Sequence, residues 1–186
     1  DVSGAGYPQT QGPGAGTSSA NGGCGSAGGS YGGTGGAVLD CGYLGGATYG
    51  SFSQPALFGS GSGVYINGFG ASGGGCVRLS AGSLSLGAGA FIAADGASSN
   101  SSGGAGGSVW INCFSLSGAG SISANGGDGS NASWGGGGGG RVAVYYTNST
   151  FTGSMQARGG FGSRGGAGTV YVKPAAQQRG TLTIDN

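Results

Sequence analysis

Few residues of this chain could perform acid–base chemistry. There is no histidine and no glutamate, and all five acidic side chains are aspartates. Asp95 and Asp128 are the candidate pair for a glycosidase, because both end a repeated segment and such an enzyme needs two facing carboxylates. Each is followed by glycine, however, and Asp-Gly is common in turns. We therefore expect these aspartates to shape turns and the protein to have no enzymatic activity.

Metal and phosphate sites are also not expected. Asp128 is followed by glycine, as in calcium-binding glycine-aspartate repeats, but those repeats carry an aspartate every time, and the next unit has Arg158 instead. The glycine run 135–140 lacks the Lys-Ser/Thr that completes a phosphate-binding loop. Without histidine or a C-x-x-C pair, a zinc site is not predicted. The sequence thus predicts no cofactor.

Cysteines and glycosylation sequons indicate an oxidising compartment. Four cysteines allow three pairings into two disulfides; they are Cys24, Cys41, Cys76 and Cys113. Three Asn-x-Ser/Thr sequons, expected in loops or at strand ends, could carry N-glycans at Asn100, Asn131 and Asn148. The first residue is Asp1 rather than Met, which indicates either a removed signal peptide or pro-segment or a fragment of a larger protein; with the features above, we expect a removed signal peptide. These features together predict an extracellular or cell-surface protein.

Aromatic side chains are candidates for subunit or sugar contacts. In an extended strand, Trp110 points away from Val109 and Ile111. Tyr145 is likewise out of phase with Val144. Outward aromatic rows are common at subunit interfaces and at ligand surfaces. The residues expected to make one of these contacts are Trp110, Trp134, Tyr145 and Tyr171.

An internal repeat of roughly 30 residues must position these side chains. Its first aligned column contains Val77, Val109, Val142 and Val170, and its second contains Leu79, Ile111, Val144 and Val172. A third column contains Ile92, Ile122 and Met155. Period-two alternation predicts short strands, and stacked units bury their apolar faces on one another. The predicted fold is all-β, a short right-handed parallel β-solenoid or β-helix with glycine-rich, partly polyglycine-II-like loops. A β-sandwich or jelly roll is the alternative.

The predicted organisation has two parts. Residues 1–37 are a glycine-rich segment, and residues 38–186 are a repeat-built domain with units near 74–96, 106–127, 139–160 and 167–186. A short strand at Val64–Ile66 should begin the repeats, and an edge strand at Thr181–Ile184 should end them. Glycine accounts for 53 of the 186 residues, and ordering it costs much backbone entropy. We expect the N-terminal segment to form an ordered glycine layer.

Charge is almost absent from the chain. Six Lys and Arg oppose five aspartates, giving a net charge of +1. A nucleic-acid partner requires a basic face, which this composition does not provide. No apolar run approaches the roughly 20 residues of a membrane helix, so membrane insertion is not expected. Low charge weakens repulsion between copies and favours assembly.

The order of motifs resembles that of glycine-rich repeat regions in large secreted or cell-surface β-solenoid-like proteins. The matching motifs are Gly28–Gly36, Tyr49–Ser51, Gln54–Pro55, Gly59–Ser60, Ala124–Gly127, Gly138–Tyr146 and Gly166–Tyr171. The resemblance implies a β-solenoid-like extracellular module and no particular chemistry. We predict an extracellular structural protein, a homo-polymer that forms a surface filament, sheath or matrix. The alternative is a carbohydrate-binding or adhesive module, and a polysaccharide-active enzyme is favoured least.

Overall fold

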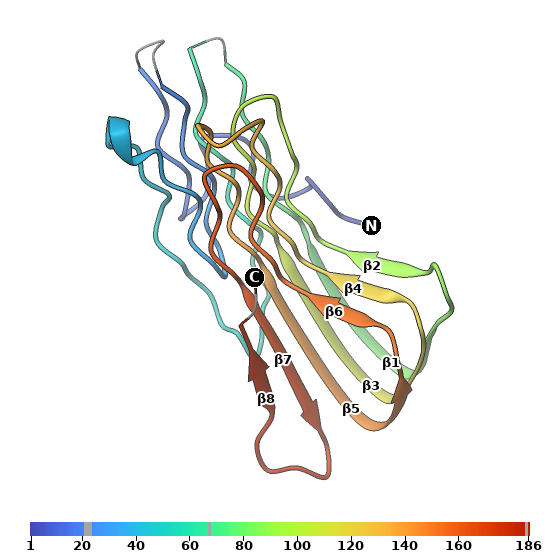
Figure 1. Cartoon of the computed structure of the whole chain (residues 1–186). Helices are drawn as coiled ribbons and strands as arrows, with labels where there is room; N and C mark the ends of the chain where they lie inside the picture. Colours follow the sequence, from blue (N-terminus) through green and yellow to red (C-terminus); the bar gives the residue numbers. More distant parts are fainter. Residues whose placement is uncertain (21–23, 67, 185) are drawn as a thin grey trace.

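A computed structural model describes residues 1–20, 24–66, 68–184 and 186. Strands occupy one end of the molecule, and extended segments without regular secondary structure run side by side toward the other end (Figure 1). One short 3-10 helix, Leu39–Cys41, lies among these segments. The molecule therefore has a strand-built part and a glycine-built part.

The strands form a parallel β-solenoid of about three turns. The larger sheet has the order β1-β3-β5-β7-β8, and the smaller has the order β2-β4-β6. Their bounds are Cys76–Leu86 (β1), Phe91–Ala93 (β2), Ser108–Gly118 (β3), Ser121–Ser123 (β4), Arg141–Phe151 (β5), Ser154–Gln156 (β6), Thr169–Pro174 (β7) and Thr181–Thr183 (β8). Neighbouring strands are parallel except β7 and β8. Each complete coil contributes one strand to each sheet, which confirms the solenoid rather than the sandwich.

The strand register confirms the alignment predicted from the repeat. Val77 pairs with Val109, Val109 with Val142, and Val142 with Val170. The second and third aligned columns pair in the same way, with Ile92 beside Ile122 and Ile122 beside Met155. Equivalent residues of successive units therefore stack, because one buried face leaves no freedom to slip by a residue.

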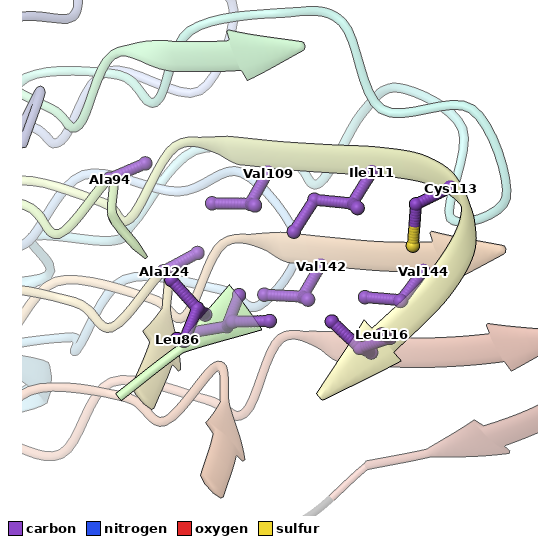
Figure 2. Packing of buried hydrophobic residues seen from close by; sticks show 10 residues of the cluster. Leu86, Ala94, Val109, Ile111, Cys113, Leu116, Ala124, Val142 and Val144 are labelled. Atoms are coloured by element: carbon purple, nitrogen blue, oxygen red, sulfur yellow. The ribbon is translucent and has the colours of Figure 1, made fainter. Parts of the chain in front are cut away.

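The hydrophobic core lies between the two sheets (Figure 2). Val109, Ile111, Val142 and Val144 project into it and are fully buried. The other buried members of this cluster are Leu86, Ala94, Cys113, Leu116, Ile122 and Ala124. Ala94 and Ala124 follow the smaller-sheet strands β2 and β4 by one residue, and their short side chains let the two sheets approach closely there.

The second part is a glycine bundle, which we define as the extended segments 4–16, 25–36, 59–63, 70–75, 96–107, 126–127, 135–140 and 159–168. These segments bond mainly to each other: the Gly103 N–H donates to the Gly135 carbonyl at 2.9 Å, and the Gly138 N–H to the Gly29 carbonyl at 2.8 Å. The N-terminal segment thus packs between loops of the repeats. A Cβ on Gly28 would stand 2.0 Å from the Gly136 carbonyl oxygen, so this spacing requires glycine.

One predicted element is absent from the described structure. Val64–Ile66 was expected to be a strand but has no strand partner. Instead the Gly68 N–H donates to the Tyr65 carbonyl and the Tyr65 N–H to the Phe69 carbonyl, closing a turn. The turn carries Ile66 out to solvent, 53% exposed. The terminal strand is present as β8, although it ends at Thr183.

Candidate functional site

The two candidate catalytic aspartates are used to join coils of the solenoid. Asp95 accepts hydrogen bonds from the Asn125 N–H at 2.6 Å and from the Ser123 hydroxyl at 3.0 Å. Asp128 accepts from the Phe161 N–H at 2.7 Å. Asn125 continues this pattern toward the next coil by accepting from the Arg158 N–H at 2.8 Å. These carboxylates satisfy backbone donors that a stack of turns would otherwise leave unpaired.

The cysteines divide into one disulfide and two free thiols. Cys24 and Cys41 are bonded, with a Cα–Cα distance of 6.4 Å, and they tie the residue before segment 25–36 to the end of the short 3-10 helix. The expected second disulfide is not formed, since Cys76 and Cys113 are free. Cys76 pairs with Ser108 across the sheet, whereas Cys113 pairs with Ala81. The two thiols are therefore offset by five residues along neighbouring strands, or roughly 16 Å, beyond disulfide reach.

All three sequon asparagines are exposed. Asn100 and Asn131 lie in neighbouring turns of the glycine part, joined by a bond from the Ser130 N–H to the Ser101 carbonyl. Asn148 was expected in a loop or at a strand end but lies inside β5. It is exposed because β7 pairs with β5 only as far as Pro174 and leaves the second half of β5 uncovered. Each site is accessible to a glycan.

The predicted aromatic residues do not form a single row. Trp110 does face away from the core, and the Arg78 guanidinium lies 4.2 Å from the centre of its ring. Trp134 packs against Tyr65 in the glycine part, with ring centroids 4.9 Å apart. Tyr145 and Tyr171 form a separate edge-to-face pair at 5.8 Å. Ala143 lies between Trp110 and Tyr171 in the register, which separates them.

The structure also shows a segment that the sequence analysis did not single out as functional. Residues 49–58, here called the strap, cross the outer face of the larger sheet. The Tyr145 hydroxyl donates to the Ser53 carbonyl at 2.6 Å, and the Ser108 hydroxyl donates to the Leu57 carbonyl at 2.6 Å. Pro55 of the strap is buried. Part of the outer face is therefore covered.

Arg141 fixes the start of the strap. It is 8% exposed, and its Nε and Nη2 donate to the Tyr49 carbonyl at 3.0 and 2.8 Å. Its guanidinium also lies 5.4 Å from the Tyr31 ring centre. Burial lowers the pKa of Arg141 and raises the pKa of Tyr49 to about 12. The repeat alignment could have singled out Arg141, because it is the one charged residue at a register position that holds small residues in the other strands: Cys76, Ser108 and Thr169.

Within the part of the chain that the structure describes, the two outer strands of the larger sheet, β1 and β8, each have a strand partner on one side only. Among the described residues of the N-terminus, Val2 accepts a hydrogen bond from the N–H of Gly75, the residue that precedes β1. β1 has eleven residues with Arg78 as its one charge, and β8 has no charged residue. Natural edge strands are usually protected by charges, proline or covering segments. These edges therefore offer backbone groups to a further strand.

Within the described ranges, no cluster of histidine, cysteine or acidic residues could hold a metal ion. Over the same ranges, no helix has the length and hydropathy to cross a membrane. Comparisons with protein-family models, curated proteins and solved structures give no match.

Proposed function

We propose that this chain is an extracellular structural protein, the repeating subunit of a surface filament, sheath or matrix. The observation that supports this most directly is the pair of unpaired edges on one sheet. β7 and β8 are antiparallel, and β1, β3, β5 and β7 are parallel, so β8 runs opposite to β1. β8 of one copy can therefore add to β1 of the next as an antiparallel strand.

Side-chain register supports this junction. One outward-facing row of the sheet contains, in order, Arg78, Trp110, Ala143, Tyr171 and Leu182. Placing Leu182 opposite Arg78 of a second copy continues this row without interruption. The contact joins different surfaces of the two copies, so each addition leaves a free β1 and a free β8. Repeated addition produces a filament.

The ends of the core add an apolar contribution. At the β1 end, Leu79, Leu84 and Ile92 are half-buried against the core. At the other end, Met155 and Val170 are half-buried against it. Covering such side chains stabilises a contact by about 25 cal/mol for each Å² of apolar surface removed from water. The low charge of the chain leaves little repulsion to oppose the contact.

The extracellular assignment rests on the Cys24–Cys41 disulfide and the three exposed sequons. Disulfides persist in oxidising compartments, and N-glycans are added to chains that enter the secretory route. Glycans on Asn100 and Asn131 would project from the glycine part, away from β1 and β8. They would therefore coat the assembly without blocking the junction.

Electron microscopy of the purified chain over a range of concentrations tests this proposal. We expect filaments for the native chain and monomers for Leu182→Lys, because the new ammonium would face Arg78 of the next copy. Phe114→Lys is the matched control, since Phe114 is also exposed but lies on the inner strand β3. The double variant Leu182→Lys with Arg78→Glu should restore filaments.

A native chain that remains monomeric, or closes into a dimer through two β1 edges, would contradict the proposal. So would equal behaviour of Leu182→Lys and Phe114→Lys. Circular dichroism of each variant establishes that loss of filaments does not come from loss of fold.

A further inference from the structure

A hollow of about 280 Å³ lies where β7 leaves the larger sheet. β5 continues to Phe151, but β7 ends at Pro174, which has no N–H to extend the pairing. The Ala175 N–H donates to the Tyr146 carbonyl at 2.7 Å, and the chain then turns away, with the Gln177 N–H bonded to the Pro174 carbonyl. The space that a longer β7 would fill is therefore open.

Polar side chains from three consecutive strands line this hollow. Asn112, Tyr145 and Lys173 occupy one register position on β3, β5 and β7. Neighbouring strands are about 4.8 Å apart, so these three side chains extend over about 10 Å, the length of one or two sugar rings. Gln177 approaches from the loop after β7 and completes the polar lining.

The polar groups of this lining are available to a ligand. Asn112, Lys173 and Gln177 make no side-chain hydrogen bond or ion pair with any other described residue. The Tyr145 hydroxyl already donates its proton to the Ser53 carbonyl, so Tyr145 can contact a ligand through its ring. Tyr146 also lines the hollow and is half-buried. Two amides, one ammonium and the Tyr145 ring thus line one open space, whereas the Tyr146 ring points to the opposite face and packs against the core.

The charge of the hollow selects the class of ligand. Lys173 is its one charged side chain, and no carboxylate is among the lining residues. Amides can donate to and accept from sugar hydroxyls, while aromatic rings pack against the C–H faces of sugars. An ammonium pairs with a carboxylate through charge-assisted hydrogen bonds.

We propose that this hollow binds an acidic saccharide, with its carboxylate on Lys173, its hydroxyls on Asn112 and Gln177, and a ring against Tyr145. Among candidate residues for sugar contact, the site retains Tyr145 and does not use Trp110 or Trp134. It lies over β3, β5 and β7, away from the edges of β1 and β8. The proposal therefore does not depend on filament formation.

Calorimetric titration with tetragalacturonic acid, and with its methyl ester as a neutral probe, tests the proposal. We expect the acid to bind with an affinity that falls as salt rises, and the ester to bind at least about tenfold more weakly, because one charged hydrogen bond is lost. Lys173→Gln should weaken binding of the acid by a similar factor. Arg179→Gln, an exposed cation outside the lining, should leave it unchanged.

Equal binding of acid and ester would overturn the assignment of an acidic ligand. Equal loss in Lys173→Gln and Arg179→Gln would show only diffuse attraction to positive charge, and would also overturn it. Absence of binding to the acid at millimolar concentration would exclude the site. Each experiment uses the Leu182→Lys chain as well, so a result on saccharide binding stays separate from a result on assembly.

Discussion

At the scale of single residues, glycine in this protein acts as a packing group. A Cβ on Gly137 would stand 1.9 Å from the Gly104 carbonyl oxygen, far inside van der Waals contact. The Gly137 N–H meanwhile donates to the Gly127 carbonyl at 2.8 Å. The missing side chain lets two backbones come close enough to bond. The hydrogen bonds and the close contact together offset the large entropy that glycine loses on folding.

Replacing Gly137 by alanine should therefore be strongly destabilising. We expect Gly137→Ala to lower the free energy of unfolding by about 3 kcal/mol or more, because backbone rather than a movable side chain must give way. Gly82→Ala is the matched control, since nothing lies within 4 Å of its Cβ position and its φ is not positive. That change should stabilise the protein by about 0.4–1 kcal/mol, because alanine lowers the conformational entropy of the unfolded chain. Urea unfolding of both variants measures the difference, and equal effects would contradict this account.

At the scale of elements, the strap joins the strand-built and glycine-built parts. Tyr49 packs against Tyr31 with ring centroids 4.7 Å apart, and its hydroxyl donates to the Phe58 carbonyl at 2.6 Å. Arg141 holds the Tyr49 carbonyl from the sheet side. Burial of the Tyr31 and Tyr49 phenols disfavours their ionised forms and raises their pKa values, and the nearby Arg141 charge offsets this only in part.

Stability should consequently fall at alkaline pH. A tyrosine in the unfolded chain ionises near pH 10, whereas burial raises the pKa of Tyr49 to about 12 in the folded state. The folded state thus binds more protons between these values, so its stability is complete below pH 10 and declines as pH rises toward 12. Thermal unfolding across this range should show a shallower decline for Tyr49→Phe than for the native chain. Tyr43→Phe, outside the strap, should keep the native slope; identical slopes in all three chains would refute the assignment.

The elements also show what the sequence could predict. The columns of Val77 and Leu79 fixed strand positions and register, because apolar side chains at period two have one face to bury. The pairing of Gly28 with Gly136 could not be predicted, since glycines carry no side chain that distinguishes one neighbour from another. The hollow beside Lys173 could not be predicted either, because it depends on where Pro174 ends β7. The prediction of a strand at Val64–Ile66 was wrong because hydrogen bonds within this stretch close a turn instead. Trp134 was a candidate contact residue by type, but only the fold placed it against Tyr65.

At the scale of the whole molecule, each repeat unit contributes both to the strand-built part and to the glycine-built part. Each unit passes from a strand into an extended glycine segment, through a turn and back to the next strand. Tyr31 is fully buried in the glycine part, and its hydroxyl lies 2.7 Å from the Ser108 hydroxyl of β3. Neither part can therefore lose its packing without exposing surface of the other.

Unfolding should accordingly be a single cooperative transition. We expect the calorimetric enthalpy to equal the van't Hoff enthalpy, with tryptophan fluorescence and far-UV circular dichroism changing together. Replacing Cys24 and Cys41 by serine should shift this transition without splitting it, by about 3 kcal/mol for a loop of this size. Replacing Cys76, a half-buried free thiol outside the core cluster, by serine is the control for thiol loss and should have a smaller effect. Two separate transitions would show that the glycine part folds independently.

The dense backbone contacts of the glycine bundle have a consequence for inheritance. Every missense change at a glycine codon replaces the glycine by a residue that has at least a Cβ. Where that atom would meet a carbonyl oxygen at about 2 Å, as at Gly103, Gly126 and Gly165, we expect the change to destabilise the fold strongly. Most non-synonymous variants at those codons should be lost from a population, whereas variants at Gly82 or Gly87, with open space around them, should persist. Natural variation should therefore be low at the closely packed glycines of the bundle and higher at the glycines that have open space around them.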